Sequence, residues 1–209
     1  MIERFVDARA AGRALAPLVH SWLSTSGSPG PTVLLAPLPT EGLIDPVIEA
    51  TGLPAIGVIV TAGSADVSCA LSRPADREAV VRAGTVVVLD RGVETGRRAL
   101  GVASAVRAWC RSTTAAATNV LDDHPLPVLV LGVGVCPRQA QPALTAVYQT
   151  VIAVQQPLAR RGLGWHYEDL PARVVGDRAE NEEGLPADAS DSMTSPSSVV
   201  LGRTANQRH

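Results

Sequence analysis

Residues 86–100 have the sequence VVVLDRGVETGRRAL, and this stretch decides the fold that the sequence predicts. Three valines and a leucine lead into Asp90, a glycine-bearing turn follows, and a run with helical spacing comes next. A buried strand, a tight turn and a helix make one repeat of an α/β protein. Because ligands of open α/β sheets bind beyond the carboxyl ends of the strands, the turn is the first candidate for a site.

The alternation of strand and helix extends along the chain on both sides of this stretch. Short apolar runs predict strands at residues 33–36, 56–60, 86–89, 128–133 and 151–154. Helical spacing predicts helices at residues 7–24, 43–50, 77–82, 95–110 and 139–147. Since parallel neighbours need crossover connections, this order predicts an α/β fold with an open parallel sheet flanked by helices.

Length and composition indicate one domain followed by a tail. The chain has 209 residues, 46% of them hydrophobic, which suffices for one sizeable core. We expect this domain at residues 1–177. Residues 178–209 are rich in Asp, Glu, Ser and Pro and have no apolar periodicity, so they are predicted to form a disordered tail.

Several classes of function are excluded by composition. A net charge of -2 without a basic stripe argues against a nucleic-acid partner. No apolar run reaches the length of a membrane span and the first residues are charged, so we expect a cytoplasmic protein with no membrane partner. The sequence contains no lysine, which excludes a Walker A loop and a Schiff base, and its bias towards Arg, Ala and Gly is typical of a GC-rich bacterial genome.

The sequence predicts neither a metal site made of clustered side chains nor a disulfide. The adjacent residues Asp122, Asp123 and His124 lie in a Pro-flanked loop and are not expected to converge on one ion. The three cysteines have no CxxC spacing and are predicted to be reduced. Near the end of the domain, Trp165, His166 and Tyr167 are predicted to pack onto the edge of the sheet.

The turn after Asp90 has the features of a phosphate cradle. Backbone amides from Val93 to Arg97 can converge on an anion at the start of the helix, where the helix dipole favours negative charge. Gly92 and Gly96 would let the backbone approach it closely. In the alternative, purely structural interpretation, Thr95 caps an ordinary helix and the arginines after it are solvated.

Residues 90–98 resemble the phosphoribosyl pyrophosphate (PRPP) motif of type I phosphoribosyltransferases. In that family an apolar strand ends in two acidic residues, followed by a small apolar pair, Ala-Thr-Gly and a further Thr. Asp90 matches the first acidic position, and Thr95 and Gly96 match the Thr-Gly pair. The resemblance implies that Asp90 is the catalytic residue that holds the ribose, directly or through magnesium (Mg2+). It also implies a substrate-binding loop made of Asp90, Arg91, Gly92, Val93, Glu94, Thr95, Gly96, Arg97 and Arg98.

The resemblance extends over about four-fifths of the chain. Residues 36–54 are similar to the family's strand, pyrophosphate loop and helix, with the loop formed by Pro39, Thr40, Glu41 and Gly42. A capped helix start explains Thr40 and Glu41 equally well. The first helix and the segment 151–171 resemble those of a bacterial subgroup of the family.

Three positions depart from the motif. The second acidic position is Arg91, the small residue before Thr95 is Glu94, and the second threonine is Arg98. Glu94 puts a carboxylate beside the expected phosphate, which opposes binding unless this side chain points away or pairs with an arginine. The interval between residues 60 and 86 is also too short for the family's mobile hood loop, and a strand and a short helix are expected to use most of it.

The sequence therefore leaves three hypotheses. The first is a phosphoribosyltransferase-family protein that binds PRPP or a nucleoside 5-monophosphate and transfers ribosyl 5-phosphate to a nitrogen base with Mg2+. The second is a catalytically silent nucleotide-binding or regulatory protein of the same fold, favoured by Arg91 and Glu94. The third is an unrelated doubly wound enzyme that holds another phosphate ester. Because family members are commonly dimers, the resemblance also implies a homodimer.

Overall fold

The computed structural model describes residues 4–27, 30–39, 42–62, 67–116 and 126–170. These residues form a six-stranded sheet in the order β3-β2-β1-β4-β5-β6. The strands are β1 (Thr32–Leu38), β2 (Ala55–Ala62), β3 (Val67–Leu71), β4 (Thr85–Gly92), β5 (Val128–Val135) and β6 (Thr150–Gln155). β3 pairs antiparallel with β2, and the other neighbouring pairs are parallel.

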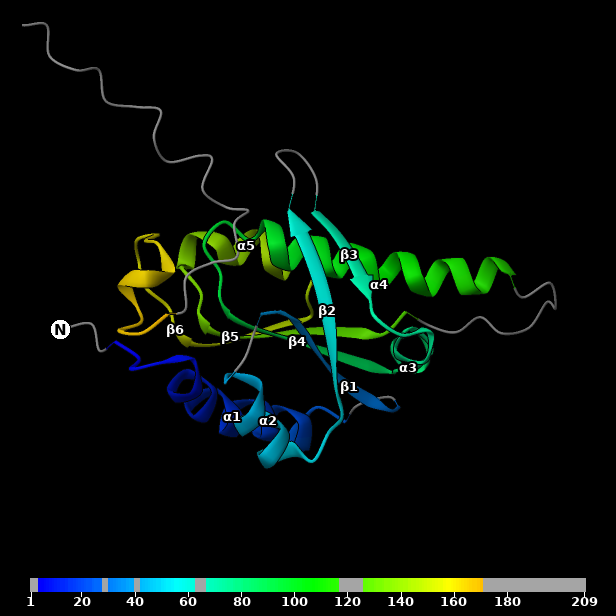
Figure 1. Cartoon of the computed structure of the whole chain (residues 1–209), viewed down its shortest axis with the longest axis horizontal. Coiled ribbons are helices and arrows are strands. Elements are labelled where there is room, and N and C mark those ends of the chain that lie inside the picture. The colour runs from blue at the N-terminus through cyan, green and yellow to red at the C-terminus, as the bar shows by residue number, and fades with distance from the viewer. Residues whose placement is uncertain (1–3, 28–29, 40–41, 63–66, 117–125, 171–209) are drawn as a thin grey trace, which may run out of the picture. The chain divides into compact units, whose positions relative to one another are not determined.

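Helices cover both faces of this sheet (Figure 1). One face carries α1 (Ala8–Thr25) and α2 (Ile44–Thr51), and the other carries α3 (Pro74–Arg82), α4 (Arg97–Ala116) and α5 (Gln141–Thr145). Two short 3-10 helices, η1 (Arg138–Ala140) and η2 (Leu163–Trp165), follow β5 and β6. Successive residues of a buried strand enter different cores, as Val88 packs with α4 and Leu89 with α1.

The predicted strands and helices are present, with ends that shift by a few residues. The parallel sheet is confirmed for five strands, and the interval between residues 60 and 86 holds the expected strand and short helix, β3 and α3. The sequence did not predict that β3 runs antiparallel at the edge. Its side chains alternate between half-buried and exposed, and Val67 contacts Gly101 of α4, so only one face of this strand joins the core.

α1 begins at a side-chain cap and packs very closely against α2. The carboxylate of Asp7 accepts a hydrogen bond of 2.6 Å from the Ala10 amide, which satisfies one free donor of the first turn. In the middle of the helix, a Cβ atom on Gly12 would lie 2.3 Å from the carbonyl oxygen of Leu43. Only glycine therefore fits where α1 crosses the start of α2.

The segment after β6 returns across the carboxyl ends of the strands. Phe5 and Tyr167 form an isolated bridge with their rings 5.3 Å apart, and the Phe5 amide donates to the His166 carbonyl. His166 and Tyr167 are each 1% exposed, so the prediction that they pack onto the sheet is confirmed. It is wrong for Trp165, which is 63% exposed, with the guanidinium of Arg161 4.8 Å from its ring centroid.

The tail, the loop before β5, the helix lengths and the cysteines were also subjects of prediction. The predicted tail at residues 178–209 and the loop at residues 122–124 lie outside the described residues. Where the structure describes helices, none is long and apolar enough to cross a membrane. Cys69, Cys110 and Cys136 are free thiols, as the sequence predicted.

Candidate functional site

The candidate loop lies at the carboxyl end of β4, near the centre of the sheet. β4 ends at Gly92, α4 begins at Arg97, and residues 93–96 connect them. Gly96 has φ +86°, a left-handed conformation that favours glycine. A Cβ on Gly92 would lie 2.4 Å from the Leu163 side chain, so this glycine makes room for the C-terminal segment.

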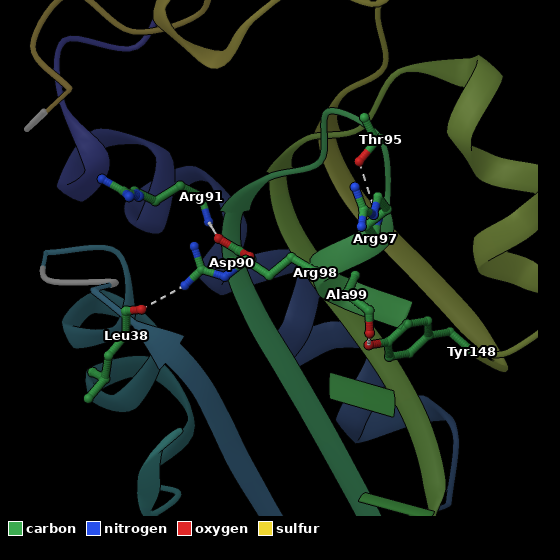
Figure 2. A network of polar contacts seen from close by, with 8 residues as sticks. All are labelled: Leu38, Asp90, Arg91, Thr95, Arg97, Arg98, Ala99 and Tyr148. Atoms are coloured by element: carbon green, nitrogen blue, oxygen red, sulfur yellow. Dashed lines mark hydrogen bonds and ion pairs between the residues drawn. The ribbon is translucent and has the colours of Figure 1, made fainter. Parts of the chain in front are cut away.

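Asp90 is the buried acid of the site, 5% exposed. Its Oδ1 accepts a hydrogen bond of 2.7 Å from the Arg91 amide, and its Oδ2 lies 3.5 Å from Nε of Arg98 (Figure 2). Burial raises the pKa of the Asp90 carboxyl, and the charges of Arg98 and Arg91 partly oppose this rise. The folded protein therefore holds a proton on Asp90 more tightly than the unfolded chain does.

Arg98 links the carboxyl ends of β1 and β4. Its Nη2 donates a hydrogen bond of 2.8 Å to the carbonyl of Leu38, the last residue of β1, while its Nε faces Asp90 at the end of β4. Figure 2 shows this side chain running from the start of α4 across to β1. The guanidinium thus lies between the carboxyl ends of two neighbouring strands.

Arg91 occupies the motif's second acidic position and is 7% exposed. Its side chain points away from Arg98 (Figure 2). Its Nε is buried and has no hydrogen-bond partner among the described residues. Its carbonyl accepts a hydrogen bond of 2.6 Å from the Tyr167 hydroxyl, which fastens the C-terminal segment to the end of β4.

Glu94 contacts the C-terminal segment of the domain. Its Oε1 accepts a hydrogen bond of 2.7 Å from the Leu163 amide in the C-terminal segment. This hydrogen bond fixes one carboxylate oxygen of Glu94 to another part of the chain.

The backbone of the loop offers fewer amides than the sequence predicted. The Val93 amide donates to the Val135 carbonyl at 2.8 Å, so it is already occupied. The Arg97 amide lies 3.4 Å from Oγ1 of Thr95, which agrees with the capping interpretation of this threonine. Within the described residues, the amides of Thr95 and Gly96 have no protein acceptor. Of the amides predicted from Val93 to Arg97, those of Thr95 and Gly96 are therefore available to an anion before the start of α4.

The second predicted loop is described only at its ends. Pro39 follows β1 and Gly42 has φ +82°, whereas Thr40 and Glu41 lie outside the described residues. Gly42 lies close to the backbone of Arg9 in α1, with 3.5 Å between the position of a built Cβ and the Arg9 amide nitrogen. The pyrophosphate loop and the capped helix start therefore both stay predictions for Thr40 and Glu41.

The charges around Asp90 do not fit a divalent cation. Mg2+ prefers several oxygen ligands, commonly carboxylates, at short distance. Asp90 shares its oxygens with the Arg91 amide and the Arg98 guanidinium, and the neighbouring acidic position is an arginine. The described residues contain no cluster of three or more His, Cys, Asp or Glu side chains that could hold a metal ion.

The contacts to distant segments were not predicted from the sequence. Arg98 was noted as a departure, yet its partner Leu38 is 60 residues away, and Leu163 is 69 residues from Glu94. Tyr148 was also missed, although its buried hydroxyl donates to the Ala99 carbonyl at 2.6 Å and steadies the first turn of α4. Tyr148 lies two residues before β6, and no sequence pattern there indicates a contact with α4.

Comparison with solved structures identifies the fold. The chain overlaps with TT1426 from Thermus thermophilus at a TM-score of 0.53 and 22% identity, over 81% of this chain and 92% of that chain. Smaller overlaps occur with an APRTase from Giardia lamblia complexed with 9-deazaadenine (TM-score 0.46, 9% identity, 72% of this chain and 81% of that chain). A hypoxanthine phosphoribosyltransferase from Staphylococcus aureus gives TM-score 0.45 and 12% identity, over 72% of this chain and 76% of that chain.

The overlap with TT1426 shows that this chain shares that protein's fold, and the open, mostly parallel sheet flanked by helices confirms the fold class that the sequence predicted. No protein-family model and no curated protein matches the sequence. At 22% identity this likeness establishes the fold alone.

The raised pKa of Asp90 leads to a prediction on stability. The native chain must hold an ionised, buried carboxylate as pH rises through the folded-state pKa, whereas an Asp90→Asn variant has no such proton to lose. We expect Asp90→Asn to be the more stable protein at neutral pH and to lose this advantage below the ordinary aspartate pKa of about 3.9. Urea unfolding at both pH values measures the difference. A variant less stable than the native chain at neutral pH would contradict it.

Proposed function

We propose that residues 90–98 bind a phosphorylated ribose, either PRPP or a nucleoside 5-monophosphate. The observation that carries this proposal is the pair of available amides, Thr95 and Gly96, at the start of α4 and five to six residues after a buried carboxylate, Asp90. The amides and the helix dipole suit a 5-phosphate. Asp90 suits the ribose hydroxyls, because a carboxylate accepts two hydrogen bonds from a diol.

A transferase reaction belongs to the same proposal. The bond from the ribose C1 to pyrophosphate would break, and pyrophosphate would leave with the bonding electrons. A bond from C1 to a base nitrogen would form, and the proton of that nitrogen would pass to the solvent. Mg2+ would accompany this reaction in the family, although the charges around Asp90 do not favour it here. We further propose a cytoplasmic protein that acts as a homodimer.

A catalytically silent, nucleotide-binding protein of the same fold is the second candidate. The link between Asp90 and Arg98 favours it, because the carboxylate that would serve the ribose already has a cationic partner. Binding of ligand without turnover across a panel of purine and pyrimidine bases would distinguish this protein from a transferase.

Titration calorimetry with ribose 5-phosphate tests the site. We expect Gly96→Ala to weaken binding about tenfold or more, because a side chain at φ +86° strains the loop by about 1–2 kcal/mol and moves both amides. Gly164→Ala is the control, since a Cβ there meets no atom within 4 Å. Equal affinities for all three proteins would exclude residues 90–98 as the site.

A further inference from the structure

We infer that this site binds its phosphorylated ribose without a divalent cation, and that the guanidinium of Arg98 supplies the positive charge between the carboxyl ends of β1 and β4. The inference rests on the proposed function and specifies the ligand class. The ligand is a 5-phosphate monoester, such as a nucleoside 5-monophosphate, in preference to magnesium-bound PRPP.

The first support is the charge of the loop. Residues 90–98 contain two carboxylates and three arginines. One carboxylate, Glu94, accepts from the Leu163 amide in another segment. With three arginines against two carboxylates, these residues carry a net charge of +1, which favours a phosphate over a metal ion.

The second support is the place of Arg98. The side chain bridges Oδ2 of Asp90, at 3.5 Å, and the carbonyl of Leu38, at 2.8 Å. These are the carbonyl and carboxylate oxygens that a cation between the ends of β1 and β4 would use. A metal ion bound to Asp90 would have to displace the guanidinium, because two cations on one carboxylate repel each other.

The third support is Arg91, which stands where the motif has a second carboxylate. Its side chain is buried, and its Nε has no hydrogen-bond partner in the described part of the chain. A buried cation beside Asp90 adds a positive potential to the site even though its side chain points away from Arg98. The site thus has one acidic residue, Asp90, where the motif has two, and a cation, Arg91, at the second acidic position.

A preference for a monoester follows from these charges. PRPP carries a pyrophosphate that binds Mg2+ strongly in solution, and the site has no carboxylate pair to receive that ion. A 5-phosphate monoester needs only amides and an arginine, which form charge-assisted hydrogen bonds. Binding of a monophosphate without metal also favours a silent, nucleotide-binding role over transfer.

The experiment is calorimetric titration of the whole chain with ribose 5-phosphate and with adenosine 5-monophosphate, each in excess EDTA and in excess magnesium chloride. For the native chain we expect dissociation constants that agree within about twofold between the two buffers. Arg98→Thr, which restores the motif residue, is expected to weaken binding in EDTA by about tenfold or more. Arg111→Thr removes an exposed arginine from the same helix, α4, and is the matched control for net charge.

The outcomes separate the two claims. Binding of the native chain in magnesium but not in EDTA would overturn this inference and leave the proposed function standing. No binding of either ligand in either buffer would overturn the proposed function as well. Thermal unfolding of Arg98→Thr verifies that the variant is folded, and the double variant Arg91→Asp/Arg98→Thr, with the motif residues restored, is expected to make binding of PRPP depend on magnesium.

Discussion

Gly12→Ala is expected to lower the free energy of unfolding by about 2–3 kcal/mol, near the upper end of the usual cost of overpacking. A Cβ atom at this position would lie 2.3 Å from the carbonyl oxygen of Leu43 and 3.0 Å from its carbonyl carbon. Both are backbone atoms, so no change of rotamer relieves the contact, and α1 must move away from α2. The gain of about 1 kcal/mol in helix propensity is smaller than this cost.

Denaturant unfolding of Gly12→Ala and of the Gly164→Ala control measures this effect. Gly164 has open space around a built Cβ, so its replacement should change the free energy of unfolding by less than about 0.5 kcal/mol. Equal stability of the two variants would show that α1 and α2 are not in contact at Gly12.

Gly134→Ala is expected to cost about 2–3 kcal/mol as well, and its effect reaches the candidate site. A Cβ on this residue of β5 would lie 2.5 Å from the Tyr167 hydroxyl and 2.8 Å from the Arg91 carbonyl oxygen. It would therefore break the hydrogen bond that fastens the C-terminal segment beside Asp90. Unfolding in denaturant gives the stability of the variant.

A double-mutant cycle with Tyr167→Phe tests the stated cause. Tyr167→Phe alone should cost about 1–3 kcal/mol, because the Arg91 carbonyl loses its donor. The double variant should cost less than the sum, since one of the two clashes at Gly134 disappears with the hydroxyl. Tyr148→Phe removes another buried tyrosine hydroxyl, bonded to Ala99, and should be additive with Gly134→Ala. Additivity in both cycles would disprove the contact between Gly134 and Tyr167.

The architecture could be predicted from the sequence because its signals are local. Valine-rich runs of strand length and helical spacing lie within single elements, and Gly96 marks a backbone conformation that few other residues adopt. The position of Asp90 at the end of a buried strand follows from the same pattern. No local pattern indicated that β3 runs antiparallel, because strand direction depends on its neighbours in the folded sheet.

The electrostatics of the site could not be predicted, since they depend on contacts between distant segments. Glu94 and Arg98 were recognised as departures from the motif, but their orientations depend on the Leu163 amide and the Leu38 carbonyl. Each long side chain has several rotamers, and the tertiary partner selects one of them. The exposure of Trp165 was not predicted for the same reason. Nothing in the local sequence distinguishes it from His166 and Tyr167, which follow it directly and are both buried.

The central claim is that the start of α4 binds the phosphate of a ribose ester. Nuclear magnetic resonance of the nitrogen-15-labelled chain during titration with ribose 5-phosphate tests it most directly. We expect the amide resonances of Thr95 and Gly96 to shift and saturate with ligand, while the resonance of Val93, whose amide already donates to Val135, moves less. Unchanged resonances at Thr95 and Gly96 at saturating ligand would contradict the proposed site.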